Sequence, residues 1–310
     1  MPTQCFSSFE AFFDANRHAN LRAMVLGPDR GDWVLTNMVV DRLGVQFGQA
    51  AGNAVVEGAP QSGGVSIFIL TQGLSAISGN GRRFDDLTLM VGRPGDDFCL
   101  AADSWRRWCS LYVPNEELAG AREDGPTTVG AMRGVCRLPP HRMARFRSVV
   151  QQLDETVQLA PDAFKSAAAQ KTTRQKLVRE IRTVLAVPED VQVPLGRHVV
   201  PRSQIIRLSM DFVDQQGGKY LSVEQLAGAA GVSERTLRDA FQKYFGVAPV
   251  QYLNRRTLHH VRRALKAADP SVSTVTDIAA QFGVWQLGRF ARDYCFLFGE
   301  FPSETLRRLY

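Results

Sequence analysis

The sequence lacks the features that define several classes of protein. Its five cysteines are odd in number and show no C-x-x-C spacing, which argues against a disulfide framework and a zinc knuckle. No apolar run approaches the ~20 residues of a membrane span. The first residues, MPTQCFSSFEAFF, show no basic start followed by an apolar stretch. We therefore expect a cytoplasmic protein with no membrane partner.

Histidine is also scarce, because the chain has five and none lies between residues 19 and 140. Clustered imidazoles with a carboxylate hold catalytic metals, and Ser or Cys nucleophiles usually need a histidine base. That stretch lacks the side chain, so we expect no catalytic residue, no metal site and no cofactor. An enzyme with a cupin-like domain is the least favoured alternative.

The charge that is present is unevenly distributed along the chain, whose net charge is +6. Residues 1–140 hold 12 basic and 15 acidic side chains, whereas residues 201–310 hold 15 basic and 10 acidic ones. An excess of positive charge suits a polyanionic partner. The later part of the chain is therefore the candidate for contact with nucleic acid.

The first 140 residues have the pattern of an antiparallel β-domain. A short amphipathic helix is expected over residues 7–16, capped by Ser7 or Ser8. After it, short runs rich in β-branched and aromatic residues alternate with Gly, Asn, Asp and Pro. These runs are WVLTNMVV, VSIFILT, LTLMVG, FCLAA and WCSLYV. The pattern predicts a sandwich or a barrel.

The next segment has helical periodicity and ends in a proline-rich stretch. Apolar residues recur at three- and four-residue steps from Met143 to Val157, and a second helix follows. Residues 188–201 hold three prolines, which do not fit inside helices or central strands. The expected division is a β-rich effector-binding domain at 1–140, a helical dimerisation segment at 141–187, a linker at 188–202 and a helical domain at 203–310.

Two segments in the last hundred residues share one plan. The first is SVEQLAGAAGVSERTLRDAFQKYFGVAP (222–249), and the second is TVTDIAAQFGVWQLGRFARDYCFLFGEFP (274–302). The matching pairs include Gly231 with Gly283, 52 residues on, and Phe241 with Tyr294, Gly246 with Gly299 and Pro249 with Pro302, 53 residues on. The spacing indicates a repeated unit with one residue inserted at the turn of the second copy.

The first copy predicts two short helices joined by a tight turn, which is the helix-turn-helix arrangement. Ser222 and Gln225 form a capping box, Gly231 suits a left-handed helix end, and Ser233 caps the next helix. In that helix the residues at steps i, i+3, i+4 and i+7 are expected to face the core: Leu237, Ala240, Phe241 and Tyr244. Its opposite face is expected to enter the major groove.

The second copy and the helix between the copies complete the unit. The core stripe of the second recognition helix is expected at Leu287, Phe290, Tyr294 and Leu297. The connecting helix has apolar positions at Val250, Leu253, Leu258, Val261 and Leu265. At its length, ~25 Å at 1.5 Å per residue, it could set the recognition helices about one DNA turn apart. The expected bounds are about 222–245 and about 274–297 for the two units, and about 249–267 for the connecting helix.

The predicted DNA contacts lie on the outer faces of the two units. Base contacts are expected from Arg235, Arg238, Asp239, Gln242, Gln286, Arg289 and Arg292. Phosphate contacts, which position the protein without reading sequence, are expected from Ser233, Arg256 and Lys266. The remaining arginines of the connecting helix, including Arg262, are expected to face solvent or phosphates.

Three segments of this region together match one family pattern: LAGAAGVSERTLRDAFQKYFGVAPVQYL, then DIAAQFG, then FGEFPSETLRR. They resemble the DNA-binding domain of AraC/XylS-type transcription regulators. The form FGVWQLGRFARDYCFLFGEFPSETLRR is most similar to the subgroup containing the ethanolamine-utilisation regulator, although Val284 and Trp285 depart from the family pattern. The resemblance implies an α+β chain, with an N-terminal cupin-like sensor domain, then helices, then an all-α C-terminal domain.

The resemblance also implies a function and partners. It implies a homodimeric transcription activator that binds double-stranded DNA, acts with RNA polymerase and responds to an unknown small-molecule effector. Two alternatives with the same DNA-binding domain stay open. One is a redox sensor using Cys99, Cys109 or Cys136. The other is a nucleotide-responsive regulator that uses the R-x-x-x-R pair Arg133 and Arg137.

Overall fold

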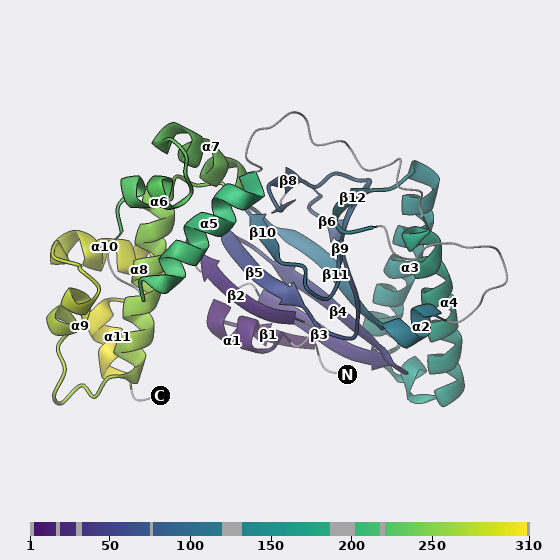
Figure 1. Cartoon of the computed structure of the whole chain (residues 1–310). Helices are drawn as coiled ribbons and strands as arrows, with labels where there is room; N and C mark the ends of the chain where they lie inside the picture. The colour runs from purple at the N-terminus through teal and green to yellow at the C-terminus, as the bar shows by residue number, and fades with distance from the viewer. Residues whose placement is uncertain are drawn as a thin grey trace.

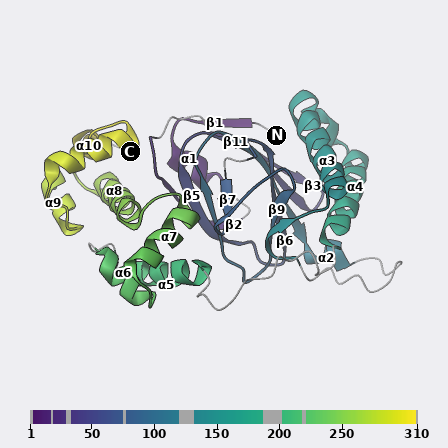
Figure 2. The same cartoon turned by 90° about the horizontal axis from the view of Figure 1, so that it is seen from above.

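The computed structural model describes residues 3–16, 19–28, 33–74, 77–119, 132–186, 202–217 and 221–308. Two antiparallel β-sheets occupy the middle of the molecule (Figure 1). Two long helices cover one side of this β-domain, and the C-terminal helices pack on the other, as the view from above also shows (Figure 2). This arrangement confirms the predicted order of a β-rich domain, helices and an all-α domain.

The larger sheet has the strand order β1-β3-β4-β11-β6-β9-β12, and the smaller has the order β2-β5-β10-β7-β8. The larger comprises β1 (Thr3–Phe6), β3 (Trp33–Val40), β4 (Leu43–Ala50), β11 (Arg106–Pro114), β6 (Gly64–Gln72), β9 (Thr88–Gly92) and β12 (Gly134–Arg137). The smaller comprises β2 (Ala19–Val25), β5 (Ala54–Pro60), β10 (Phe98–Ala102), β7 (Ile77–Gly79) and β8 (Arg82–Arg83). The five predicted runs correspond to β3, β6, β9, β10 and β11.

Four α-helices precede the predicted linker in the described part of the chain. Helix α1 (Phe9–Asp14) is capped by Ser8, as predicted, and α2 (Asn115–Ala119) follows β11. Helices α3 (Pro140–Leu159) and α4 (Ala167–Leu185) are separated by a 3-10 turn at Pro161–Lys165. The predicted stripe of α3 is buried against α4 and the larger sheet. The predicted linker lies almost entirely outside the described residues.

The C-terminal domain consists of seven helices within the described part of the chain. They are α5 (Arg202–Gln215), α6 (Val223–Ala229), α7 (Glu234–Phe245), α8 (Pro249–Ala267), α9 (Val275–Gln281), α10 (Leu287–Phe298) and α11 (Pro302–Arg307). Helix α8 is the predicted connecting helix, between the α6–α7 and α9–α10 units. None of the described helices is both long enough and apolar enough to cross a bilayer.

Two predicted core positions are wrong. Val250 is 52% exposed, because it lies in the first turn of α8 on the solvent side. The aromatic ring that fills this part of the core is Tyr252, which stacks on Phe245 with ring centroids 4.5 Å apart. Leu287 is 37% exposed, because it is the first residue of α10 and projects beyond the packed part of the helix. Phe298, at the other end of α10, is buried instead.

Candidate DNA-binding surface

The turn of the first unit is built as the sequence predicted. The Ser222 hydroxyl accepts a hydrogen bond from the Gln225 amide at 3.2 Å, and the Gln225 side chain accepts one from the Ser222 amide at 2.9 Å. Gly231 has φ of +65°, which a residue with a side chain rarely adopts. The Ser233 hydroxyl accepts from the Thr236 amide at 3.2 Å and so begins α7. These bonds fix the angle between α6 and α7.

Helix α7 has one buried face and one exposed face. Leu237, Ala240 and Phe241 are fully buried in the C-terminal core. The four predicted base-contacting residues of this helix are all exposed: Arg235, Arg238, Asp239 and Gln242. The structure therefore brings these four side chains together on one outward face.

The four exposed side chains of α7 differ in their existing partners. Arg238 forms an ion pair with Glu234 at 2.5 Å. Asp239 pairs with Arg202 at 3.1 Å and with Lys243 at 3.0 Å, and hydrogen bonds from both hold the pKa of its carboxyl below the usual value. Arg235 has no ion pair among the described residues. Arg235 is thus exposed and outside any ion pair among the described residues, while Asp239 already accepts from two partners.

The second unit has the same helix-turn-helix arrangement, but apolar side chains are exposed at the start of its recognition helix α10. Thr274 caps α9 by accepting from the Asp277 amide at 3.1 Å. Gln286 stands at the N-cap position of α10 but makes no side-chain cap. Arg289 and Arg292 are exposed on α10, and Arg289 lies 3.7 Å from Asp293. The predicted base-contacting residues of this unit therefore also face outward.

Trp285 is a surface residue that the sequence analysis did not include among the DNA contacts. It precedes α10 and is 79% exposed, which is unusual for a large aromatic side chain. Leu287 is exposed beside it in the sequence. The signal in the sequence was the absence of a capping residue at this position. An exposed apolar side chain at the start of a recognition helix suits a thymine methyl group.

The predicted phosphate contacts on α8 lie where the two halves of the molecule meet. Arg256 pairs with Asp214 at 2.6 Å, and Lys266 pairs with Glu10 of α1 at 2.6 Å. Both cations are partly buried. Either would have to exchange its carboxylate for a phosphate to contact DNA, so their role as phosphate contacts stays a prediction.

Arg262 is not solvent-facing, contrary to the sequence analysis. It is 8% exposed and forms ion pairs with Glu10 at 3.0 Å and with Glu300 at 3.1 Å. Its guanidinium also lies over the ring of Phe298, 4.4 Å from the centroid. A single helix with many arginines does not reveal which face another domain covers, and this face is covered by α1 and α11.

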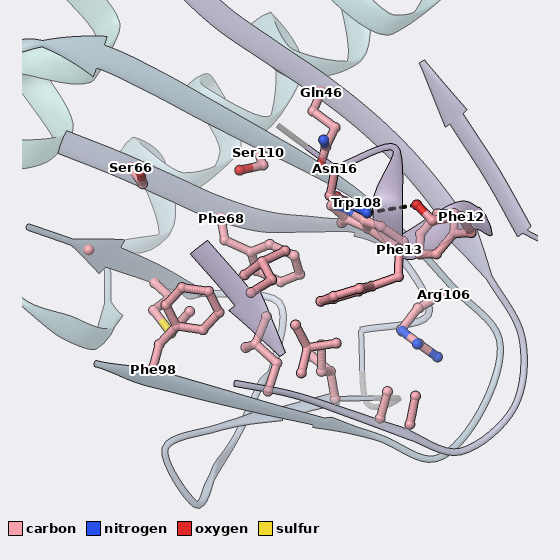
Figure 3. Close-up of a pocket in the computed structure, with 18 of the residues that line it drawn as sticks. Phe12, Phe13, Asn16, Gln46, Ser66, Phe68, Phe98, Arg106, Trp108 and Ser110 are labelled. Carbon is pink, nitrogen blue, oxygen red and sulfur yellow. Dashed lines mark hydrogen bonds between the residues drawn. The ribbon is translucent and has the colours of Figure 1, made fainter. Parts of the chain in front are cut away.

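The second feature of the molecule that could bind a partner is a cavity in the β-domain (Figure 3). It lies between the two sheets and encloses about 110 Å³. Its walls are mainly apolar and include the aromatic side chains of Phe9, Phe12, Trp33, Phe68, Phe98 and Trp108. The sequence did not identify these residues, since they come from five separate elements.

Of the residues behind the redox and nucleotide alternatives, Cys99 and Cys109 are buried, Cys136 is half-buried, and both arginines form ion pairs. Burial raises the pKa of the Cys99 and Cys109 thiols well above the usual value, which keeps them protonated and unreactive. Arg133 pairs with Asp96 at 3.1 Å, and Arg137 pairs with Asp85. Within the described residues, no three His, Cys, Asp or Glu side chains are grouped to hold a metal ion.

Comparison with known proteins places the C-terminal domain in a family. A model described as a helix-turn-helix domain matches residues 226–308. The XylDLEGF operon transcriptional activator of Pseudomonas putida is 37% identical over 99 residues, which are 32% of this chain and 31% of that protein. A protein of Rhodococcus erythropolis named "Probable thc operon regulatory protein" is 39% identical over 103 residues, 33% of this chain and 31% of that one.

A solved structure matches the same region. It is titled a probable AraC family transcriptional regulator from Rhodopseudomonas palustris, and it is 35% identical, with 34% of this chain and 95% of that chain covered and a TM-score of 0.31. The chain thus spans about a third of the length of the two curated relatives. The C-terminal domain is a helix-turn-helix domain, similar in sequence to the corresponding regions of these operon regulators. The finer resemblance to the ethanolamine-utilisation subgroup stays a prediction.

Proposed function

We propose that the chain is a sequence-specific DNA-binding transcription regulator that responds to a small-molecule effector and acts as an activator. The observation that carries the proposal is the pair of helix-turn-helix units on one connecting helix. Each presents exposed arginines on its recognition helix, Arg235 and Arg238 on α7 and Arg289 and Arg292 on α10. Arginine is the side chain that most often contacts guanine in the major groove.

The partners proposed for the chain follow from the same reasoning. The double-stranded DNA contact is supported by the exposed faces of α7 and α10. Relatives named as operon activators support a role with RNA polymerase. A cavity in the β-domain supports a small-molecule effector. We place the protein in the cytoplasm, where its DNA target would be.

A homodimer is proposed through the segment 141–187. The apolar stripes of α3 and α4 are already buried against each other and the larger sheet. A dimer through this segment would therefore use its outward polar faces, where α4 carries Lys171, Lys176 and Arg179.

The proposed function is tested by DNA binding of the full chain. Fragments of the source genome are selected on the immobilised protein, and a selected duplex is labelled for fluorescence anisotropy. We expect the selected duplex to bind at least ~1,000-fold more tightly than random duplex of the same length, the lower end of specific recognition. Equal affinity for the two duplexes at every salt concentration would overturn the proposal.

A further inference from the structure

Among the described residues that line the cavity of the β-domain, Arg106 is the one charged group, and the rest are mostly apolar with a few neutral polar side chains. Arg106 belongs to β11, whose residues 106, 108 and 110 line the cavity, while the intervening Cys109 belongs to the core beneath α3 and α4. Figure 3 shows the Arg106 side chain at the end of the cavity opposite Ser66 and Phe98. The cavity thus has a cationic end and an aromatic body.

Arg106 is buried, and no described residue provides it with a counter-ion. It is 5% exposed, and its Nη1 donates to the carbonyl oxygens of Gly52 at 3.1 Å and Ser104 at 2.9 Å. Among the described residues, no carboxylate forms an ion pair with it. Asp103, the acid that acts on it electrostatically, is paired with Arg83 at 2.7 Å. A buried charge with no partner is costly, and removing that cost favours an anionic occupant.

The electrostatics of Arg106 agree with this geometry. Burial lowers the pKa of its guanidinium to about 10, which still leaves the group charged at neutral pH. At the other end of the cavity, the Ser66 hydroxyl is buried and has no hydrogen-bond partner among the described atoms. Both polar ends of the cavity therefore have bonding capacity that the protein itself does not use.

The size and lining of the cavity limit its occupant. A cavity of about 150 Å³ with aliphatic and aromatic walls holds one benzene molecule, so about 110 Å³ fits roughly one ring or a short branched chain. The aromatic walls favour an apolar body. A nucleotide would be too large, and an ammonium ion would be repelled by Arg106.

We propose that this cavity binds a small apolar monocarboxylate, with its carboxylate on Arg106 and its apolar body among the aromatic side chains. The proposal rests on the proposed function, since it names the chemical class of the effector. Arg106 provides two N–H groups, Nε and Nη2, that no described residue accepts from. A guanidinium binds a carboxylate through two such parallel bonds.

The test is isothermal titration calorimetry on the full chain with matched probes. The acids are phenylacetate, cyclohexanecarboxylate and 4-methylpentanoate, each paired with its neutral amide, and 2-phenylethylammonium is the cation. We expect at least one acid to bind roughly tenfold or more tightly than its amide, with no heat from the cation. An amide that binds as tightly as its acid, or no heat from any acid at millimolar concentration, overturns the proposal.

Two variants locate the site. Arg106→Gln should lower the affinity for the binding acid to that of its amide, whereas Arg42→Gln, the same change in a surface ion pair with Glu116 away from the cavity, should leave it unchanged. Ala102→Leu fills the cavity from β10 without altering Arg106 and should abolish binding of acid and amide alike. An acid that still binds Ala102→Leu with unchanged affinity shows that it binds elsewhere.

The same samples separate this proposal from the proposed function. Anisotropy with the selected duplex is measured beside each titration, using the unliganded full chain. If the chain prefers its selected duplex but binds no acid, the effector class is wrong and the regulator function stands. If an acid binds and the chain shows no sequence preference, the cavity proposal stands and the regulator function is wrong.

Discussion

The two arginines of α7 are held differently before any DNA is bound. Arg238 shares an ion pair with Glu234 on the same helix, and Arg235 has no ion pair among the described residues. An exposed helical pair of this kind contributes only about 0.3–0.5 kcal/mol. A bidentate contact with guanine provides more than that, so the pair with Glu234 does not prevent Arg238 from contacting a base.

Arg238→Ala is expected to cost ~1–3 kcal/mol of binding to the selected duplex and to flatten preference at one base position. Lys266→Ala is the contrasting variant, because Lys266 lies in the last turn of α8 and would contact only a phosphate, after leaving its ion pair with Glu10. It should weaken selected and random duplex alike and reduce the salt slope by about one unit. The measurement is binding to single-base variants of the duplex at two salt concentrations. Equal losses for every sequence in Arg238→Ala would mean that Arg238 only positions the protein.

His259 links the C-terminal domain to the smaller sheet and responds to pH. Its Nε2 lies 3.2 Å from the carbonyl oxygen of Val25, and its ring packs edge-on against Phe298. Burial lowers its pKa from 6.5 to about 4, helped by Arg262 and Arg263, while the Val25 bond and Glu10 oppose the shift. The folded state therefore disfavours protonation of His259.

Because the folded pKa lies below the unfolded one, the stability contributed by neutral His259 is complete above pH 6.5 and is lost as the pH falls toward 4. Between pH 7.5 and 5 the loss should be about 2 kcal/mol. We expect the C-terminal domain of His259→Gln to lose about that much less than the wild type over this range, measured by urea unfolding. The imidazole pKa from NMR titration gives a direct check, and a value near 6.5 would contradict this account.

At the scale of elements, α11 is held to α8 and α10 by a buried polar network. Glu300 pairs with Arg262 at 3.1 Å and accepts from the Thr305 hydroxyl at 2.8 Å. The Tyr294 hydroxyl donates to Thr305 at 2.8 Å. Removing one member of a buried network leaves the others unpaired, which costs more than the bond itself provides.

Glu300→Ala is therefore expected to destabilise α10 and α11 by roughly 3 kcal/mol or more. Glu304→Ala is the matched control, since Glu304 is exposed and accepts only from the Phe301 amide at 2.6 Å. It should cost about 1 kcal/mol, the usual value of a cap. Hydrogen exchange of peptides from these two helices measures both changes. Similar protection of these peptides from hydrogen exchange in both variants would show that the buried network does not hold α11 to α8 and α10.

The sequence predicted elements whose own residues determine them, and it missed elements that depend on distant partners. The α3 stripe and the Ser222 capping box follow local rules, and both are found. Strand β4 was not predicted, because glycines lower strand propensity. The structure explains Gly48, since a Cβ there would lie 2.1 Å from the Trp108 ring. The buried face of α8 was also not predicted, because its burial depends on α1, a helix far away in the sequence.

At the scale of the molecule, the two halves share their cores. Helix α1 lines the cavity through Phe9 and Phe12, and from the same helix Glu10 pairs with Arg262 and Lys266 of α8. In the first unit, Tyr244 of α7 packs against Gly81 and lies 3.4 Å from the Asn80 side chain. The DNA-binding domain is thus docked on the β-domain through α7 and the connecting helix α8.

The fragment 203–310 is expected to prefer the selected duplex on its own, but with lower affinity than the full chain. Its helices have their own core around Leu226, Leu237 and Phe241. In the fragment, Tyr244 and His259 lose their contacts with the β-domain and become exposed to solvent, and the proposed dimer contacts are absent. Circular dichroism establishes whether the fragment is folded, and anisotropy gives its affinity. A folded fragment without any sequence preference would place the reading of DNA elsewhere in the chain.

The central claim is that the chain reads DNA sequence with α7 and α10, spaced by α8. The most direct test is selection of the full chain on a random duplex library, with sequencing of the bound fraction. The account predicts a motif with two informative blocks whose centres lie about 10 base pairs apart, one of them losing a position in Arg238→Ala. A bound fraction with no enrichment over the starting library would contradict it.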